Sequence, residues 1–298
     1  MVKRKVTKVV IPVAGMGTRF LPITKVLPKE LLPIIDKPII QLIVEECIAA
    51  GIETVIFVTA RPKILIEDYF DPRDLTSFRL EQAGKSQLIE SVLDLAKKIE
   101  IVSVRQYQPK GLGHAIYQAH SVVSGQPFAV VLGDDIMVSN SKNKSAIGDC
   151  IEEFEKLERG SVIGTIQVPL EETKMYGVVG VEGNLEKSDF LKIKSFVEKP
   201  DPKDAPSTWA MPGRYVFDSN TTDFLRAIPP GKNGEFQLTD GMNQMLKAGN
   251  PYYAKKISGK RYDTGDKFGY ITANIEFGLE DPLLKDRLQA WLEKKIKG

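Results

Sequence analysis

The sequence predicts an α/β protein whose central sheet is mostly parallel and is covered by helices. In the first half of the chain, short apolar runs alternate with segments of helical periodicity. The runs at residues 8–14, 54–59 and 128–132 have almost no polar interruption, which is typical of strands buried on both faces. With 298 residues, the chain is long enough for one large domain with a sizeable core.

Helices are predicted where apolar residues recur every three or four positions. This periodicity marks residues 38–50, 87–99 and 114–123, and a short strand at residues 101–104 separates the last two helices. Gly51 directly after the first of these helices supports the position of its end.

The second half of the chain is more mixed. Strand-like runs occur at residues 161–168, 176–181, 190–197 and 214–217. Apolar residues keep helical spacing through residues 268–279 and 284–296, and we expect them to pack into the core rather than form a subunit contact. Because no internal repeat or linker is visible, we expect a single domain over residues 1–298.

Charge and hydropathy exclude several classes of partner. The net charge is +2, from 41 basic and 39 acidic residues, which gives no sign of a nucleic-acid partner. No apolar run approaches the roughly 18 residues of a membrane span, and no long apolar region follows the basic residues near the N-terminus. We therefore expect a cytoplasmic protein with no membrane partner.

Cysteine and histidine are scarce, which limits the chemistry available. The chain has two cysteines and two histidines, and it contains neither a C-x-x-C nor an H-E-x-x-H motif. A zinc site is therefore not expected. A metal would have to be held by carboxylates, which favours a hard cation such as Mg²⁺.

A long loop at residues 15–37 separates the first strand from the first helix, although such connections usually take about 2–6 residues. Its opening Gly-Met-Gly allows backbone N–H groups to approach a ligand closely. Arg19, Lys25 and Lys29 add positive charge to the same loop. These features favour a polyphosphate site, and the alternative is a plain turn after a strand.

Two other phosphate-binding motifs fail on detail. A dinucleotide fingerprint needs a third glycine where Phe20 stands, and the helix that should follow directly is delayed. A P-loop ending in Gly84-Lys85-Ser86 would need a glycine where Arg79 stands, and no strand precedes it.

Acidic residues stand near the ends of predicted strands. Asp134 and Asp135 follow the strand at residues 128–132, where open parallel sheets bind their ligands. Asp263 is a second candidate metal ligand, because two carboxylates from distant segments can hold one Mg²⁺ against phosphate oxygens. Loop-capping acids are the alternative for the first pair, and we expect Asp266 to cap the helix after it.

Glu198 and Lys199 lie where another predicted strand ends, because Pro200 follows them. At a strand end, both side chains can reach one cleft. The carboxylate could then accept hydrogen bonds from sugar hydroxyls while the lysine meets a phosphate. Two exposed charges are the alternative.

A series of motifs follows one order along the chain, and it covers residues 8 to about 270. They are Ile11–Pro22, Pro28–Pro33, Asp36–Pro38, Val104–Gln106, Gly111–Ala115, Gly133–Asp135, Tyr176–Val179, Val197–Pro200, Gly234–Asp240 and Gly259–Lys267. Together they resemble the signature of the sugar-1-phosphate nucleotidyltransferases. The set is most similar to the bacterial-type group of that family that transfers uridylyl groups.

The resemblance implies a Rossmann-like three-layer α/β/α fold with a mixed, mostly parallel central sheet. It implies a nucleotide-binding half over about residues 1–135 and a sugar-binding half over about 136–265. Residues from about 266 to 298 would form the C-terminal helices. The resemblance also implies a homodimer or homotetramer.

The resemblance assigns roles residue by residue. The nucleotide would contact Ala14, Gly15, Gly17, Thr18, Gln106 and Gly111. Catalysis would use Arg19 and Lys29 on the triphosphate and Lys199 on the sugar phosphate. The sugar would contact Asp135, Gly177, Glu198 and Gly213. Mg²⁺ would be held by Asp134 and Asp263.

The implied reaction is Mg²⁺-dependent transfer of UMP from UTP to glucose 1-phosphate, which gives UDP-glucose and pyrophosphate. A phosphate monoester is mostly a dianion at pH 7, so direct in-line attack needs no general base. Pro212, Thr264 and a short stretch at residues 72–86 depart from the pattern of the uridylyl group. The use of dTTP or another sugar 1-phosphate therefore stays open.

Two alternatives come from other functional classes. The first is a catalytically silent protein that binds a nucleotide sugar, and the presence of Arg19 in the first loop argues against it. The second is a nicotinamide-dependent dehydrogenase, which the incomplete glycine fingerprint disfavours.

Overall fold

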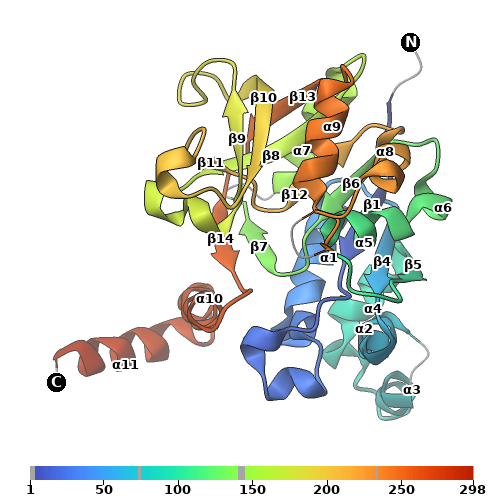
Figure 1. Cartoon of the computed structure of the whole chain (residues 1–298). Coiled ribbons are helices and arrows are strands. Elements are labelled where there is room, and N and C mark those ends of the chain that lie inside the picture. Colours follow the sequence, from blue (N-terminus) through green and yellow to red (C-terminus); the bar gives the residue numbers. More distant parts are fainter. Residues whose placement is uncertain (1–3, 73–74, 140–144, 232–233, 298) are drawn as a thin grey trace.

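The computed structural model describes residues 4–72, 75–139, 145–231 and 234–297. Within these ranges a ten-stranded sheet runs through the molecule (Figure 1). Its strands, from one edge to the other, are β11 (Trp209–Ala210), β9 (Gly177–Val181), β10 (Phe190–Glu198), β13 (Tyr252–Lys256), β8 (Ser161–Gln167), β12 (Arg214–Phe217), β6 (Phe128–Val131), β1 (Lys8–Pro12), β4 (Thr54–Thr59) and β5 (Glu100–Arg105).

The sheet is mixed, as predicted, but the expectation of a mostly parallel sheet is wrong. Strands β6, β1, β4 and β5 are parallel neighbours, and so are β8 and β13. By contrast, β12 runs antiparallel to both β6 and β8, and antiparallel pairs also join β9, β10, β11 and β13. The physical reason lies in the connections, because β9 and β10 are joined by a short turn that only an antiparallel pair permits.

Helices pack on both faces of the sheet, and alternate residues of β1 show this. Val9 and Ile11 belong to one core cluster, whereas Val10 belongs to the other. The first cluster includes residues of α1 (Ile39–Ala49), α2 (Ile64–Phe70), α4 (Glu90–Lys98) and α7 (Ala146–Lys156). The second includes residues of α5 (Leu112–Gln118), α6 (His120–Val123), α8 (Thr221–Ala227) and α9 (Leu238–Lys247).

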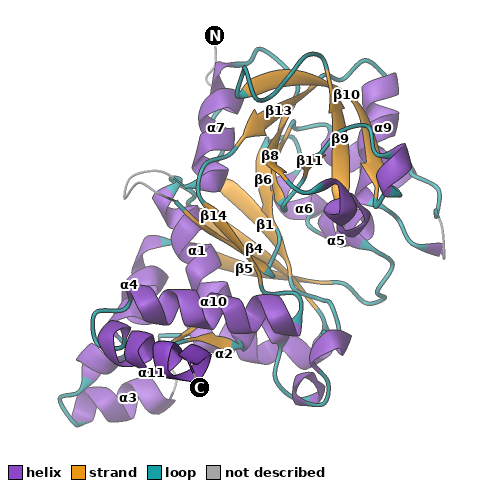
Figure 2. Cartoon of the chain, turned by 90° about the vertical axis from the view of Figure 1, so that its left-hand side faces the viewer, coloured by secondary structure: helices purple, strands orange, loops and turns teal. Residues whose placement is uncertain are grey.

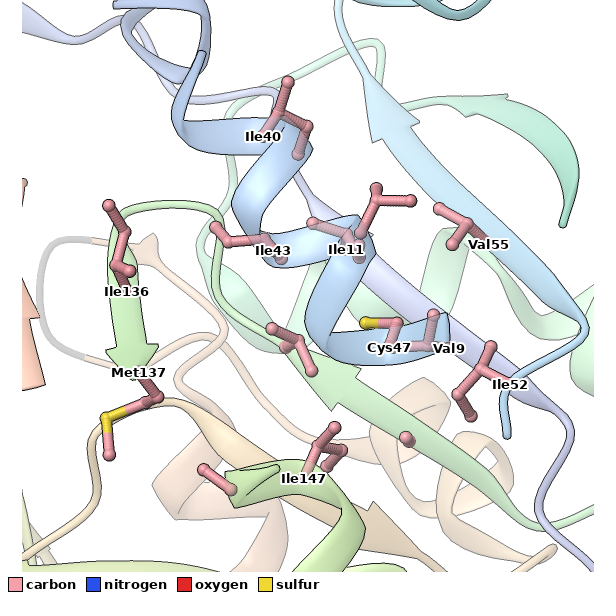
Figure 3. Packing of buried hydrophobic residues seen from close by; sticks show 14 of the residues in the cluster. Val9, Ile11, Ile40, Ile43, Cys47, Ile52, Val55, Ile136, Met137 and Ile147 are labelled. Atoms are coloured by element: carbon pink, nitrogen blue, oxygen red, sulfur yellow. The ribbon is translucent and has the colours of Figure 1, made fainter. Parts of the chain in front are cut away.

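Helix α1 is the centre of the first cluster. Figure 3 shows its side chains Ile40, Ile43 and Cys47 packed with Val55 of β4 and with Ile136 of a strand that follows β6. That strand is β7 (Asp135–Val138), and it pairs with β14 (Lys260–Asp263) in a small separate sheet. The pairing places Asp135 directly opposite Asp263.

The helices predicted in the first half are present with small shifts of their ends, and the predicted 114–123 helix is divided into α5 and α6. Helices α7, α8 and α9 were not predicted, nor were α3 (Leu75–Gln82) and strands β7, β13 and β14.

A second small sheet pairs β2 (Pro33–Ile34) with β3 (Lys37–Pro38). No helix among the described residues is long and apolar enough to cross a membrane.

The two closing helices are α10 (Lys267–Glu280) and α11 (Lys285–Lys297). The expected core packing holds only for part of α10, where Ala273 belongs to the first core cluster and Phe277 packs against it. Phe268 and Ile271 of α10 and Trp291 and Ile296 of α11 are all exposed. Helix α10 packs against β14 and α11 (Figure 2), and α11 extends away from the main sheet (Figure 1). Its apolar residues therefore have no core to join.

Candidate active site

The loop after β1 folds back on itself through three short 3₁₀ turns, Thr18–Phe20, Ile23–Lys25 and Lys29–Leu31. Gly17 has a positive φ of 63°, and a β carbon there would lie 3.1 Å from Thr24 and 3.3 Å from Lys29. Thr24 Oγ1 donates a hydrogen bond of 2.8 Å to the Gly17 carbonyl. Glycine at this position therefore allows the loop to close and brings Lys29 back toward the sheet.

One side of this loop lines a cavity of about 300 Å³, which we call the N-terminal cavity. Its walls are mostly apolar side chains and backbone, formed by Ala14, Gly15, Met16, Thr24, Lys25, Val26, Pro28, Ala60, Lys63, Gln106, Tyr107 and Pro109. Gln106 is buried, and its Nε2 lies 2.8 Å from His114 Nδ1 and 3.4 Å from the Gly111 carbonyl. These contacts orient an amide at the wall of a mostly apolar space.

Beyond the loop lies a second cavity of about 340 Å³, which we call the acidic cavity. It opens where β10 and β14 end and where β7 and β9 begin. Its charged lining residues are Arg19, Asp134, Asp135, Glu198, Lys199, Glu235, Arg261 and Asp263. Carboxylates and cations that are far apart in the sequence thus face one space.

Lys29 and Asp134 form a close ion pair at this cavity, with Lys29 Nζ 2.5 Å from Asp134 Oδ2. Burial opposes the ionisation of Asp134, but the Lys29 ammonium and its hydrogen bond lower the pKa of the carboxyl. Burial also opposes the charge on Lys29, and Asp134 nevertheless raises its pKa. Next to this pair, Glu30 is bound by Lys63 Nζ at 2.6 Å in a buried contact.

Arg261 joins two further carboxylates of the cavity, Asp135 and Asp263. Its Nη2 lies 2.5 Å from Asp135 Oδ1 and 3.1 Å from Asp263 Oδ2, and its Nη1 donates to the Tyr176 hydroxyl at 2.7 Å. Burial raises the pKa of Asp135 to about 7, and the Arg261 guanidinium opposes that rise. Arg261 was not predicted from the sequence. Its spacing from Asp263, a predicted site residue, was the available signal, because side chains two residues apart on a strand lie on the same face.

Glu198 and Lys199 lie where the sequence predicted, at the end of β10, and both line the acidic cavity. Lys199 has a positive φ of 46°, which costs a non-glycine residue of order 1–3 kcal/mol. Its backbone N–H donates to the Tyr176 carbonyl at 3.0 Å, and its Nζ lies 3.9 Å from Glu198 Oε1. Burial raises the pKa of Glu198.

The structure brings most of the predicted site residues to these two cavities. The acidic cavity is lined by Arg19, Asp134, Asp135, Gly177, Glu198, Lys199 and Asp263. The N-terminal cavity is lined by Ala14, Gly15 and Gln106. Lys29 reaches the acidic cavity through its ion pair with Asp134. The remaining predicted residues, Gly17, Thr18, Gly111 and Gly213, lie beside the cavities and do not line them.

The donor set at the acidic cavity suits a cation that is held partly by the substrate. The described residues contain no group of three or more His, Cys, Asp or Glu side chains that could hold a metal ion. Two carboxylates do converge, because a β carbon at Gly265 would lie 3.0 Å from Asp263 Oδ1 and 3.3 Å from Asp134 Oδ2. Mg²⁺ in proteins is commonly held by one or two carboxylates together with substrate phosphates, so these residues fit it.

The comparisons with known proteins agree with this arrangement. A family model described as nucleotidyl transferase matches residues 8–278, and the chain belongs to that family. Within it, the chain is 43% identical over 290 residues to a UTP–glucose-1-phosphate uridylyltransferase of Bacillus subtilis, covering 97% of both chains. It is 42% identical to the Streptococcus pyogenes enzyme of the same name, covering 97% of this chain and 94% of that one.

Solved structures place the chain among the same proteins. A UDP-glucose pyrophosphorylase complexed with UDP-glucose is 39% identical, with a TM-score of 0.84 and coverage of 93% of this chain and 100% of that one. A UTP-bound enzyme from Acinetobacter baumannii is 35% identical, with a TM-score of 0.88 and coverage of 97% and 99%. The resemblance stated from the sequence motifs is therefore confirmed.

Proposed function

We propose that the chain catalyses Mg²⁺-dependent transfer of UMP from UTP to glucose 1-phosphate, with UDP-glucose and pyrophosphate as products. The observation that carries this proposal is the meeting of Asp134, Asp263 and Lys199 at one cavity, directly beside the phosphate-suited loop. Relatives that carry the uridylyltransferase name match nearly the full length of the chain.

The nucleotide would bind across the N-terminal half, residues 1–135, of a Rossmann-like three-layer fold. The N-terminal cavity suits a nucleobase, because its walls are apolar and the Gln106 amide can form hydrogen bonds with a base edge. Backbone groups at Ala14 and Gly15 line the same wall. Gly17 and Thr18 continue the loop toward the phosphates, and Gly111 supports Gln106.

The triphosphate would lie between the two cavities, where the loop supplies its cations. Arg19 lines the acidic cavity, and its Nη1 donates to the Gly265 carbonyl at 3.3 Å. Lys29 reaches the same region through its contact with Asp134. We assign Arg19 to the leaving pyrophosphate and Lys29 to the transferred phosphate, because cations aimed at developing negative charge accelerate such reactions.

Glucose 1-phosphate would occupy the acidic cavity, in the half at about residues 136–265. Asp135 and Glu198 can accept hydrogen bonds from its hydroxyls. Gly177 lines the same cavity, where a β carbon would lie 2.3 Å from Met211 Cε and 3.3 Å from Glu198 Oε2. Gly213 lies next to Leu132, which lines the cavity, and Lys199 would bind the phosphate.

Asp134 and Asp263 would hold Mg²⁺. When bound, Mg²⁺ supplies positive charge to the phosphate oxygens and lowers the repulsion between the two anionic substrates. Lys199 would align the sugar phosphate, and Arg19 would stabilise the charge on the departing group.

The transfer itself needs no nucleophile from the protein. An oxygen of the sugar phosphate forms a bond to the α-phosphorus, the bond from that phosphorus to the bridging oxygen breaks, and pyrophosphate leaves with the electron pair. Among the described residues, Cys47 and Cys150 are buried away from the cavity. His114 contacts Gln106 and His120 contacts Thr222, so neither histidine is paired with a serine or cysteine nucleophile.

The test is product analysis after incubation with UTP, glucose 1-phosphate and Mg²⁺. We expect UDP-glucose and pyrophosphate in equal amounts, and no product when either substrate is omitted. Parallel reactions with dTTP and with galactose 1-phosphate test the choice of nucleotide and sugar. A preference for dTTP would contradict the uridylyl assignment, and no product from any pair, with UDP-glucose still bound, would favour a silent binding protein.

The family resemblance also leads us to propose that the chain forms a homodimer or homotetramer. Light scattering coupled to size-exclusion chromatography measures the mass directly. A monomer at micromolar concentration would contradict this proposal without affecting the proposed reaction.

A further inference from the structure

Behind the acidic cavity lies an ion pair that takes no part in the reaction described above. Arg214, the first residue of β12, has a side chain with 0% exposure, and its partner Glu46 of α1 has a side chain with 5% exposure. Arg214 Nη2 lies 2.6 Å from Glu46 Oε2, and Arg214 Nε lies 3.0 Å from Glu46 Oε1. Neither residue lines the acidic cavity.

The pair connects four elements of the fold. Arg214 Nη2 also donates a hydrogen bond of 2.7 Å to the carbonyl of Asp135, the first residue of β7. Glu46 Oε1 also accepts a hydrogen bond of 3.0 Å from the backbone N–H of Ile147, in the first turn of α7. Figure 3 shows Ile147 and Ile136, the residue after Asp135, among the core side chains near α1. The ion pair thus joins α1, β12, β7 and α7.

The turn that carries Asp134 is held at both of its ends, by Gly213 and by Arg214. The Gly213 carbonyl accepts a hydrogen bond of 3.0 Å from the N–H of Leu132, before the turn. The Arg214 side chain holds the Asp135 carbonyl, after the turn. Gly213 has a positive φ of 84°, and a β carbon there would lie 2.6 Å from Leu132 Cγ, so this close contact requires glycine.

The position of Asp135 sets the position of another carboxylate. Strand β7 pairs with β14 so that Asp135 lies opposite Asp263. Asp134 is fixed from the same side, because its carbonyl accepts hydrogen bonds from the Thr264 N–H at 3.0 Å and from Thr264 Oγ1 at 2.8 Å. A shift at the Asp135 carbonyl would therefore move the carboxylates of both strands.

Stability alone is a weak reason for such a pair. Removing two charges from water is costly, and apolar residues of similar volume are often as stabilising as a buried ion pair. The neighbouring strand also makes space for the arginine, since a β carbon at Gly164 of β8 would lie 3.0 Å from Arg214 Cβ. The fold thus accommodates a long, charged side chain that also donates a hydrogen bond to the turn of the site, at the Asp135 carbonyl.

We propose that Glu46 and Arg214 are positioning residues, which fix the turn at residues 132–135 and thereby the geometry of Asp134, Asp135 and Asp263. This inference rests on the proposed function, in which those carboxylates hold the metal and the sugar. Glu46 aims the guanidinium, and the guanidinium holds the Asp135 carbonyl.

The test uses the variant Arg214→Met and the double variant Glu46→Gln/Arg214→Met. The single variant leaves a buried carboxylate without its guanidinium, so we expect a lower midpoint of thermal unfolding. In the double variant, the glutamine still accepts from Ile147 and neither charge of the pair remains, so the midpoint is expected to recover. We expect kcat to stay about 10- to 100-fold below that of the unchanged chain in the folded double variant.

Two further measurements separate positioning from a purely structural role. Titration with Mn²⁺, followed by electron paramagnetic resonance, is expected to show weaker binding to the double variant by a similar factor. The matched control is Arg4→Met/Asp218→Asn, which breaks an ion pair of 2.9 Å at the opposite end of β12. Arg4 also donates to the Leu157 carbonyl at the far end of α7, so the control disturbs two of the same elements, β12 and α7, away from the site. It is expected to lower the unfolding midpoint and leave kcat unchanged.

A folded double variant with the kcat of the unchanged chain would overturn the proposal. If the unchanged chain itself releases no pyrophosphate from UTP and glucose 1-phosphate, the proposed function fails instead. The Mn²⁺ titration then decides on positioning by itself, because equal binding to the unchanged chain and the double variant overturns it.

Discussion

The acidic cavity and the N-terminal cavity lie on either side of one loop, yet they are built in opposite ways. The acidic cavity collects charged side chains from strand ends that are far apart in the sequence, and ion pairs hold Asp134 and Asp135 in place. The N-terminal cavity is formed mainly by one stretch, residues 14–28, with backbone groups and apolar side chains as its walls. Gln106, directly after β5, brings a buried amide to this second space from a distant part of the sequence.

This difference suits the acidic cavity to the chemical step and the N-terminal cavity to recognition of the nucleotide. Charges aimed at one point can bind the sugar phosphate and stabilise a transition state, so changes in the acidic cavity should act on kcat or on KM for glucose 1-phosphate. Shape and a single amide can distinguish one base from another, so changes in the N-terminal cavity should act on nucleotide selectivity. Four substitutions test this division, in order of decreasing expected effect.

Asp134→Asn should cause the largest loss, with kcat falling about 10²- to 10³-fold, because it removes a charged ligand from the point of transfer. Initial rates of pyrophosphate release measure the effect, and thermal unfolding checks that the variant is folded. The matched control is Asp266→Asn, since Asp266 caps α10 by accepting from Phe268 and Gly269, and asparagine caps equally well. Near-normal turnover of Asp134→Asn would remove this residue from the metal site.

Lys199→Ala should lower kcat about 100-fold and raise KM for glucose 1-phosphate, because the aligning charge on the attacking phosphate is lost. KM for UTP should stay unchanged. Lys203→Ala, at an exposed position in the next loop, is the control. An effect confined to UTP would show that Lys199 serves the nucleotide instead.

Glu198→Gln should raise KM for glucose 1-phosphate about tenfold, since it replaces a charged hydrogen-bond acceptor by a neutral one. Burial raises the pKa of Glu198, so in the unchanged chain its protonation begins at a higher pH than for an exposed glutamate. KM for glucose 1-phosphate should therefore rise as pH falls. The glutamine variant should lack the part of the rise in KM that comes from protonation of Glu198. Titration of the substrate phosphate affects both proteins equally, so it cancels when their pH profiles of KM are compared. Parallel profiles would contradict the role of Glu198.

Gln106→Ala should have the smallest effect on rate and should reduce the preference for UTP over CTP by about tenfold, because an amide that contacts the base edge is lost. Gln118→Ala is the matched control, since Gln118 Nε2 also contacts His114, at 3.3 Å, without lining the cavity. An unchanged UTP/CTP ratio in Gln106→Ala would place base recognition elsewhere.

The elements that were predicted correctly are those whose structure depends on local sequence pattern. Continuous apolar runs predicted β1, β4 and β6, because strands covered on both faces bury every side chain. The cap at Asp266 was also predicted correctly, because a cap depends only on the next few residues. The exposed apolar residues of α11 were misjudged, since helical spacing does not reveal whether a core lies opposite.

The residues near the site that were not predicted belong to pairs whose members are far apart in the sequence. Glu46 lies within an apolar helix, and its partner Arg214 is separated from it by 168 positions, so neither residue signals the other. Arg261 was missed for a similar reason, because its ion pair with Asp135 depends on the pairing of β7 with β14. Strand ends could be located from the sequence, but the partners of the charges that they carry could not.

In the proposed reaction the transfer is direct, with no covalent bond between the protein and the uridylyl group. Exchange of radiolabelled pyrophosphate into UTP tests it, because a covalent intermediate would allow exchange without the sugar substrate. We predict exchange when glucose 1-phosphate is present and none when it is omitted. Rapid exchange with UTP, Mg²⁺ and pyrophosphate alone would contradict the account and require a nucleophile on the protein.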